Sequence, residues 1–315
     1  MIDSYVMKIV SLLPSATEIV CALGLEENLV AITHECDFPA SITHLPAITA
    51  SRISHETMTS SEIDHAVRSQ LDGHGSIYDL DTALLEKLNP DLILTQELCD
   101  VCAVSYKQVE KAARMYVADS TVVSLEPNTI EGVFETIKTV GKLANVPAKA
   151  AEVVAGLRRR LDVIREQTKG VDRPRVFMLE WLEPPFAPGH WVPEQVEIAG
   201  GDAILGMPGQ RSVTTTFEAI FESNPEVMVL IPCGYYTADI LRQLDDQKFP
   251  ANWKEISAVK NDQVWALDAT KYFSRPGPRI VDGTEILAKI LHPEIFGLPQ
   301  NHEAVRVPSR SLNYY

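Results

Sequence analysis

Apolar and polar positions follow each other along the chain in blocks of two kinds. Short apolar runs, typical of buried strands, are separated by longer stretches in which apolar residues recur every three or four positions, as in amphipathic helices. The apolar runs are Lys8–Leu13, Leu29–Thr33, Asp91–Thr95, Thr121–Leu125, Arg175–Leu179, Glu226–Ile231 and Gln263–Ala266. Strands that alternate with helices favour βαβ units around a parallel sheet. The pattern therefore predicts an α/β fold.

The longest helical pattern lies in the middle of the chain. It spans Ala148–Thr168 and is followed by the polar stretch Lys169–Pro174, which is typical of a connector between two lobes. The other predicted helices are Ser15–Leu23, Ser61–Leu71, Leu80–Leu88, Ser105–Tyr116, Thr129–Gly141, Glu194–Ala199, Thr216–Ser223, Ala238–Leu244 and Pro278–Ile290. We expect an amino-terminal lobe over 1–127, a helical connector over 128–172 and a carboxy-terminal lobe over 173–298.

Three local features refine this picture. Ser15, with Glu18 three residues later, predicts a capping box at the start of the first helix. The segment 299–315 is a polar tail with proline, which we expect to be unstructured or loosely docked. No internal repeat is visible in the sequence.

Composition and charge limit the classes of function. The 315 residues carry a formal net charge of −15 with scattered basic residues, which argues against binding to nucleic acid or to an anionic membrane. No run approaches about 18 apolar residues, so membrane insertion is not expected. Met1–Lys8 lacks the basic and apolar regions of a secretory signal. The sequence as it stands therefore predicts a cytoplasmic protein, and a removed leader would instead make it periplasmic or cell-surface.

Cysteine and histidine residues directly follow predicted strands. In open parallel sheets, ligands bind outside the carboxyl ends of the strands. Thiolates and imidazoles select soft or borderline metals, so His34, Cys36, Cys99 and Cys102 form a candidate site for zinc or iron. The alternatives are ordinary buried cysteines, a Cys99–Cys102 disulfide, or free thiols that line a ligand pocket. Cys21 lies inside a predicted helix and is expected to be a core residue.

An ordered set of motifs resembles a known family. The motifs are Leu12-Leu13-Pro14-Ser15-Ala16-Thr17-Glu18, Asp37-Phe38-Pro39, Leu88-Asn89-Pro90-Asp91-Leu92-Ile93, Pro184-Pro185-Phe186, Ala199-Gly200-Gly201-Asp202, Asn224-Pro225-Glu226-Val227 and Arg275-Pro276-Gly277-Pro278-Arg279-Ile280. Over about residues 7–297 the chain is similar to the cobalamin and iron-siderophore substrate-binding proteins of ABC transporters, and most similar to the cobalamin-binding subfamily. The resemblance implies two Rossmann-like α/β lobes joined by a single long α-helix, with the ligand cleft between the lobes.

Aromatic residues in predicted loops beside strand ends are candidates for contact with a flat macrocycle. The candidate ligand-binding residues are Tyr78, Trp181, Phe186, Trp191, Tyr235, Tyr272, Phe273 and Arg275. The resemblance implies that Phe186 and the loop Tyr272–Arg275 match ligand-contacting positions, and that Arg275 lies at the ligand edge. His190 could reach cobalt or iron as an axial ligand, although a loop histidine is more often solvated.

The resemblance also bears on partners. Family members that serve transporters dock arginines of the permease with one glutamate on each lobe. Glu218 matches that position in the second lobe, and the equivalent in the first lobe falls near Ala83, with Asp81 close by. Glu218 favours an ABC permease as partner, whereas the missing signal and the missing first-lobe glutamate argue against it.

No catalytic motif is present in the sequence. The predicted function is non-covalent binding of a small-molecule ligand, a cobalamin-like corrinoid or related metal chelate, in the inter-lobe cleft. The second hypothesis is a cytoplasmic metal-binding protein or metalloenzyme that uses the Cys/His site.

Overall fold

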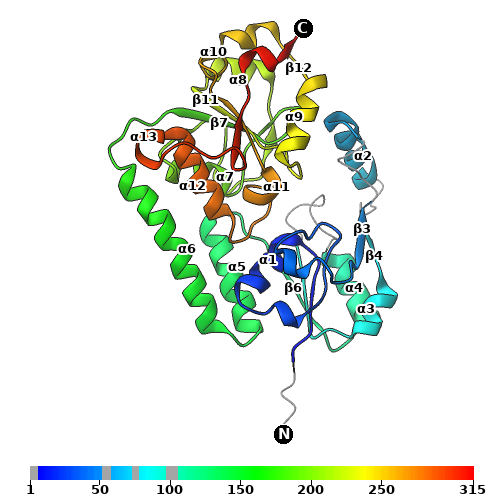
Figure 1. Ribbon diagram of the computed structural model, residues 1–315. Helices are drawn as coiled ribbons and strands as arrows, with labels where there is room; N and C mark the ends of the chain where they lie inside the picture. The colour runs from blue at the N-terminus through cyan, green and yellow to red at the C-terminus, as the bar shows by residue number, and fades with distance from the viewer. Residues whose placement is uncertain (1–5, 52–57, 73–77, 97–105) are drawn as a thin grey trace. The chain divides into compact units, whose positions relative to one another are not determined.

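The chain folds into two compact units (Figure 1). The computed structural model describes residues 6–51, 58–72, 78–96 and 106–315. Unit 1 comprises Met1–Ser54, His65–Pro127 and Gly132–Ala155, and unit 2 comprises His55–Asp64, Asn128–Glu131 and Gly156–Tyr315. Each unit contains a sheet with parallel strands connected by helices, which confirms the predicted α/β fold. No helix of the described residues is long and apolar enough to cross a membrane.

Unit 1 is built on a four-stranded parallel sheet in the order β2-β1-β5-β6. Its strands are β1 (Ile9–Ser11), β2 (Leu29–Ala31), β5 (Leu92–Thr95) and β6 (Thr121–Ser124). Its helices are α1 (Pro14–Ala22), α3 (Thr82–Leu88), α4 (Tyr106–Tyr116), most of α5 (Ile130–Leu143), and the short η1 (Glu26–Asn28) and η2 (Ala40–Ile42). An antiparallel pair, β3 (Thr49–Ser51) and β4 (Tyr78–Leu80), brackets α2 (Ser60–Asp72) in the sequence.

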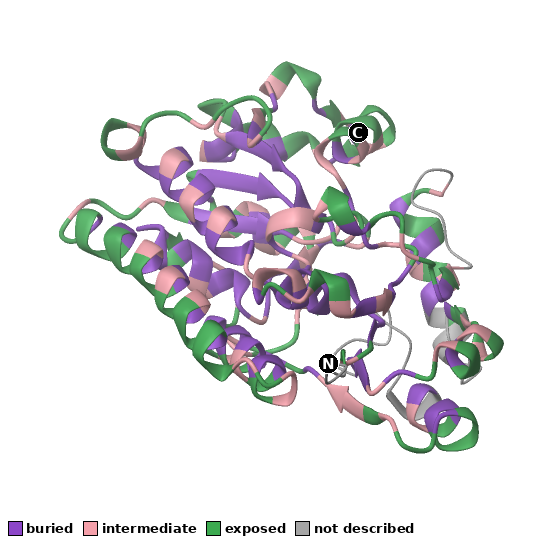
Figure 2. Cartoon of the chain, turned by 60° about the horizontal axis from the view of Figure 1, so that its bottom comes forward, coloured by how far each residue is buried: buried purple, intermediate pink, exposed green. Residues whose placement is uncertain are grey.

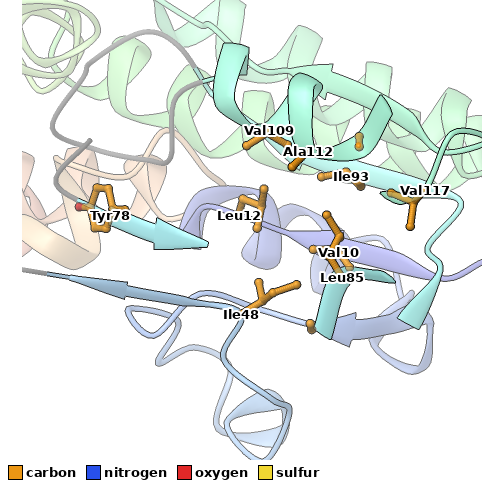
Figure 3. Close-up of a cluster of buried hydrophobic side chains, with 11 residues drawn as sticks. Val10, Leu12, Ile48, Tyr78, Leu85, Ile93, Val109, Ala112 and Val117 are labelled. Atoms are coloured by element: carbon orange, nitrogen blue, oxygen red, sulfur yellow. The ribbon is translucent and has the colours of Figure 1, made fainter. Parts of the chain in front are cut away.

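The core of unit 1 lies between this sheet and two of its helices. Figure 3 shows Val10 and Ile93 of the central strands next to Leu85 of α3 and Val109 of α4. The full cluster is Val10, Leu12, Ala31, Ile48, Tyr78, Leu85, Ile93, Val109, Ala112, Ala113 and Val117. Burial of these side chains fixes the strands whose carboxyl ends carry the candidate ligands.

Unit 2 contains a five-stranded sheet in the order β14-β13-β11-β7-β9. Its strands are β7 (Arg175–Leu179), β9 (Asp202–Ala203), β11 (Val227–Leu230), β13 (Val264–Leu267) and β14 (Ala304–Arg306). Two further pairs are β8 (Phe186–Ala187) with β10 (Val213–Thr214) and β12 (Lys248–Phe249) with β15 (Asn313–Tyr314). The helices are α7 (Val192–Ile198), α8 (Phe217–Ser223), α9 (Thr237–Asp246), η3 (Ala251–Glu255), α10 (Ser257–Lys260), α11 (Ala269–Tyr272), α12 (Ile280–Leu291), α13 (Pro293–Phe296) and η4 (Ser309–Ser311). Figure 2 shows the central strands of this sheet in the buried colour.

The predicted long helix is present as α6 (Pro147–Gln167). It begins in unit 1 and continues in unit 2 from Gly156. Its buried residues recur at helical spacing and include Val154, Leu157 and Leu161. In unit 2, the Arg160 guanidinium binds Asp282 and Glu285 of α12 at 2.5 and 2.6 Å. All four tryptophans of the chain, Trp181, Trp191, Trp253 and Trp265, also belong to unit 2.

The tail is more ordered than we expected. Instead of being loose, the chain after Gly297 forms β14, which pairs antiparallel with β13 at the edge of the sheet. It then forms β15, which pairs with β12. Val307 donates its backbone N–H to Val264 at 2.8 Å, which continues the pairing beyond β14. The polar composition hid these strands because an edge strand needs only one partner and few buried side chains.

The predicted capping box at Ser15 is wrong. Helix α1 begins at Pro14, its N-cap is Leu13, and no side chain caps it. Proline favours the first helical position because its missing N–H has no partner there in any case. Ser15 and Glu18 are consequently inside the helix and buried.

The structure contains an internal repeat that the sequence did not reveal. The segment α3–β5 of unit 1 has the same local structure as α8–β11 of unit 2. Asp81 and Thr216 precede the two helices, and each accepts a backbone N–H of the first turn, at 2.9 and 3.1 Å. Both helices have seven residues and end at an asparagine in the left-handed conformation, Asn89 and Asn224. Asparagine tolerates this conformation better than most residues, which explains its recurrence.

The repeat extends to the strand that begins each sheet. The carboxylate of Asp91 accepts the backbone N–H of Lys8 at 2.7 Å, and that of Glu226 accepts the N–H of Arg175 at 2.9 Å. The side chains of Lys8 and Arg175 in turn donate to the last carbonyl of α3 and of α8. Both units therefore fix the entry of their first strand in the same way.

Candidate functional site

His34 lies at the carboxyl edge of the unit 1 sheet, just beyond β2. Its Nδ1 is 2.8 Å from Thr49 Oγ1, and its backbone N–H donates to the same oxygen at 3.3 Å. Its ring packs at a tilt against Tyr78, with 5.7 Å between centroids. The side chain remains 27% exposed. The imidazole is thus held at one nitrogen while part of the ring faces outward.

Glu35 and Tyr78 complete the polar group beside His34. The Tyr78 hydroxyl donates to Glu35 Oε1 at 3.3 Å, and that oxygen lies 3.9 Å from His34 Nε2. The backbone N–H of Glu35 donates to Thr33 Oγ1 at 3.0 Å, which fixes the turn after the strand. Tyr78 comes from β4 and is only 7% exposed, so its hydroxyl is held in place by a packed ring.

Cys36 points into the interior of unit 1 and is 8% exposed. Its Sγ lies 3.1 Å from Thr17 Oγ1 and 3.4 Å from Thr33 Oγ1. Thr17 itself donates to Ser11 Oγ at 2.8 Å, so the thiol joins a buried row of hydroxyls. Cys21 lies in α1 as predicted, but it is half-buried instead of being a core residue. Partial burial together with Glu26 raises the pKa of its thiol to about 12.

The predicted four-ligand metal site combines His34 and Cys36 with Cys99 and Cys102. Cys99 and Cys102 lie outside the described residues. Over the described ranges, no group of three or more His, Cys, Asp and Glu side chains could hold an ion. The complete Cys/His site therefore stays a prediction.

Aromatic side chains gather at the carboxyl edge of the unit 2 sheet. Trp181 follows β7, and its ring meets the edge of Tyr235, which follows β11, at 5.5 Å between centroids. Trp181 Nε1 donates to the carbonyl of Glu183 at 3.1 Å, and the residue forms an isolated bridge with Phe186. Trp181 and Phe186 are half-buried, so part of each ring remains available to a ligand.

Tyr235 is fully buried and packs against Trp181, and its predicted contact with a ligand stays a prediction. Its hydroxyl lies 3.2 Å from Ser60 Oγ, and burial raises the pKa of the phenol. Gln243 donates to the carbonyl of Met58 at 3.3 Å, so the segment around the start of α2 is attached to unit 2 at two points. Tyr235 therefore positions Trp181 from behind.

The remaining predicted ligand-binding residues differ in how far they are buried. Trp191 is buried and donates its Nε1 to the carbonyl of Phe273 at 2.8 Å, and Phe273 is buried as well. These two side chains hold α7 against the loop that follows α11. Arg275 is 7% exposed, whereas Tyr272 is half-buried. Contact of any of these four residues with a ligand stays a prediction.

An ion pair between a buried carboxylate and a partly exposed ammonium follows β13 at the same edge of the sheet. Asp268 follows β13, caps α11, and binds Lys271 Nζ at 2.6 Å. Burial raises the pKa of Asp268, against the opposing effect of Lys271. The Lys271 ammonium also lies over the ring of Tyr236, 5.6 Å from its centroid.

His190 is held by the backbone around it. Its φ is 51°, its N–H donates to the carbonyl of Gln210 at 2.6 Å, and its carbonyl accepts from Gly209 at 2.9 Å. Its Nε2 is buried and has no hydrogen-bond partner among the residues that the structure describes. Burial, with Arg211 nearby, lowers the pKa of the imidazole. Ligation of a metal by this ring stays a prediction.

Glu218 lies in the first turn of α8 and is exposed. In the repeat described above, it stands two residues after the capping Thr216, and the matching residue of unit 1 is Ala83, two after Asp81. The two helices therefore differ in charge at the position that the resemblance connects with permease docking. A docking role for Glu218 stays a prediction.

Thr49 and Ser60 were not predicted as site residues. Thr49 lies in a short strand whose pairing with β4 crosses the whole α2 segment, and Ser60 reaches a residue far along the chain. Neither residue belongs to a motif, so only the three-dimensional structure could reveal their roles.

Comparison with known proteins identifies the family. The chain belongs to the periplasmic binding protein family, whose sequence profile matches residues 9–270. It is 24% identical over 282 residues to the vitamin B12-binding protein of Vibrio cholerae, which covers 88% of this chain and 86% of the relative. It is 26% identical over 298 residues to an uncharacterized ABC transporter substrate-binding lipoprotein of Bacillus subtilis, with 92% and 81% covered.

Solved structures support the same fold. The periplasmic heme binding protein of Pseudomonas aeruginosa superimposes with a TM-score of 0.68 at 18% identity, over 96% of this chain and 99% of that protein. At this level of identity, the likeness concerns the fold alone. The family match therefore confirms the predicted resemblance to substrate-binding proteins.

Proposed function

We propose that the protein binds a metal-containing macrocycle of the tetrapyrrole type, with a cobalamin-like corrinoid as the preferred ligand. The relatives named above, a vitamin B12-binding protein and a heme binding protein, support this class of ligand. Both ligands present a broad ring face and are built around a chelated metal. The proposal concerns binding and does not require a chemical step.

The observation that carries the proposal is the aromatic group at the carboxyl edge of unit 2. Trp181 and Phe186 are partly exposed, and Tyr235 holds Trp181 from its buried side. Rigid aromatic faces bind flat apolar ligands at low entropic cost, because few rotamers are lost. Strand ends of an open α/β sheet are also the usual place for ligands.

Titration calorimetry combined with absorption spectroscopy tests this function. We expect one cyanocobalamin per chain and weaker binding of heme. Trp181→Ala and Phe186→Ala should each weaken corrinoid binding by about 1–3 kcal/mol, or about 5- to 150-fold.

Phe296→Ala provides the matched control. Phe296 is a half-buried phenylalanine at the end of α13, and it does not follow a strand. Its substitution should leave the affinity unchanged. If heme gives a heat of binding and corrinoids give none, heme replaces the corrinoid as the preferred ligand. The absence of any response to corrinoids, heme and ferric siderophores would refute the proposed function itself.

A further inference from the structure

The inference begins with the strand end next to the aromatic group of unit 2. Strands β7, β11 and β13 are parallel neighbours, so Trp181, Tyr235 and Asp268 follow them at the same edge of one sheet. Thr270 of α11 donates its backbone N–H to the carbonyl of Tyr235 at 3.2 Å, and the Tyr235 ring meets that of Trp181. Helix α11 is therefore attached to the aromatic group, and all of these residues belong to unit 2.

Lys271 of α11 brings a positive charge to this edge. Its Nζ binds Asp268 Oδ2 at 2.6 Å and lies over the ring of Tyr236, 5.6 Å from the centroid. The Lys271 side chain is 37% exposed, whereas that of Asp268 is 7% exposed. An ammonium group has three N–H donors, so it can bind Asp268 and an acceptor on a ligand at the same time.

The charges around Lys271 favour an anionic acceptor. Asp268 lies near two cations, Lys271 and Arg279, and the three groups together carry a charge of +1. Burial raises the pKa of Asp268, which further limits the negative charge that it contributes. Two other carboxylates affect Tyr272 of the same helix. Each of them is already bound by a cation at 2.5 Å, Asp282 by Arg160 and Glu303 by Lys289.

The spacing of the strands suits a ligand that is broad and acidic at its rim. Strand β11 lies between β7 and β13, so the ends of β7 and β13 are two strand spacings, or about 10 Å, apart. A macrocycle that covers Trp181 and Phe186 therefore extends its peripheral groups toward Lys271. Tetrapyrroles carry their acidic groups at this periphery, as propionates in heme and as the phosphodiester of the nucleotide loop in cobalamin.

We propose that Lys271 binds an anionic oxygen group at the rim of the macrocycle, and that this edge therefore selects acidic tetrapyrroles over their neutral analogues. The inference rests on the proposed function and specifies one chemical group that the ligand must carry. A phosphodiester and a carboxylate offer the same charged oxygen, and matched probes separate the two.

Titration calorimetry with two matched pairs of probes tests the inference. Cyanocobalamin is compared with dicyanocobinamide, which lacks the nucleotide and its phosphodiester. Ferric heme is compared with its dimethyl ester, in which both propionates are neutral. Lys271→Gln should weaken binding of the acidic member of at least one pair about tenfold and leave its neutral analogue unchanged. The unchanged affinity for the neutral analogue also shows that the variant is folded.

Lys260→Gln provides the matched control. Lys260 Nζ binds Glu255 at the same distance of 2.6 Å, but it lies in α10, which precedes β13. Figure 1 shows α10 and α11 at opposite ends of the strands of unit 2. This variant loses the same charge and should bind all four probes as the wild type does.

The outcomes separate this inference from the proposed function. A selective loss with cyanocobalamin identifies the phosphodiester as the bound group, and a selective loss with heme identifies the propionate. If Lys271→Gln binds the acidic and neutral members with the wild-type ratio in both pairs, the role of Lys271 is wrong and macrocycle binding stands. The same conclusion follows if Lys260→Gln shows an equal selective loss. If none of the four probes binds to the wild-type protein, both proposals fail.

Discussion

The environment of His190 favours the neutral form of its imidazole. The left-handed backbone at φ 51° directs the ring so that Nε2 is buried, and Arg211 adds positive charge nearby. Both effects disfavour a protonated ring, and the pKa is accordingly lowered. A group with a lowered pKa takes up a proton more readily in the unfolded chain than in the folded one.

This property predicts a loss of stability in mild acid. As the pH falls below about 6.5, the unfolded state binds the His190 proton first, so the free energy of unfolding decreases. His190→Asn should reduce this dependence, because asparagine does not titrate and tolerates the left-handed conformation. Urea unfolding at pH 7.5 and 5.5 measures the difference between the two proteins. The control, His302→Gln at an exposed position, should retain the wild-type slope. An equal slope in His190→Asn would contradict the prediction.

Single residues also show where sequence reasoning succeeds and where it ends. The strand-end position of His34 could be predicted because the preceding apolar run is unmistakable. The contact between Cys36 and Thr17 could not, since Thr17 belongs to helix α1, far from Cys36 in the sequence. The capping error at Ser15 is local in origin, because Pro14 takes the first helical position and moves the N-cap two residues back, to Leu13.

At the scale of elements, two helical glycines have opposite roles. Gly283 lies in α12, where an added Cβ would meet the carbonyl oxygen of Tyr272 at 2.7 Å and its Cβ at 2.9 Å. Glycine therefore allows α12 to approach the end of α11. Gly156 lies in α6, and nothing would lie within 4 Å of its added Cβ.

The same substitution should accordingly have opposite effects at the two sites. Gly283→Ala should lower the free energy of unfolding by about 1–3 kcal/mol, because the backbone of Tyr272 must move. Gly156→Ala should raise it by about 0.5–1 kcal/mol, the ordinary helix-propensity gain. Urea unfolding followed by circular dichroism measures both. A gain at both positions would show that α11 and α12 are not closely packed.

The major elements could be predicted because their periodicity is strong and their apolar runs are uninterrupted. The short pairs β8–β10 and β12–β15 were not predicted, since strands of two residues carry no periodic signal. The pairing partners β13 and β14 are also far apart in the sequence. Short strands of this kind are determined by tertiary contacts rather than by local pattern.

At the scale of the molecule, the repeat of α3–β5 and α8–β11 means that both units fix the start of their first strand by the same hydrogen bond. The sequence concealed it because only Asn-Pro followed by an acidic residue is shared, at Asn89 and Asn224. Asp91 and Glu226 differ in length, yet each reaches a backbone N–H of the strand-entry residue. The physical requirement, a carboxylate at one place, is conserved between the units while most side chains are not.

The tail has a structural role in unit 2, so its removal should be costly. Deleting residues 298–315 would expose the edge of β13, whose four residues are buried, and leave unpaired backbone groups there. We expect a lower unfolding midpoint and aggregation, measured by light scattering during heating. Deleting only residues 313–315, which removes β15 and retains β14, should have a smaller effect. Equal behaviour of both truncations would assign the protection to β15.

The uneven distribution of tryptophan has a consequence for optical work. Because every indole of the chain belongs to unit 2, emission excited in the indole band reports on that unit and leaves unit 1 unobserved. Corrins and hemes absorb where indoles emit, so they quench nearby tryptophans by energy transfer. Trp181, half-buried at the carboxyl edge of the unit 2 sheet, is then a natural donor to a ligand that binds there.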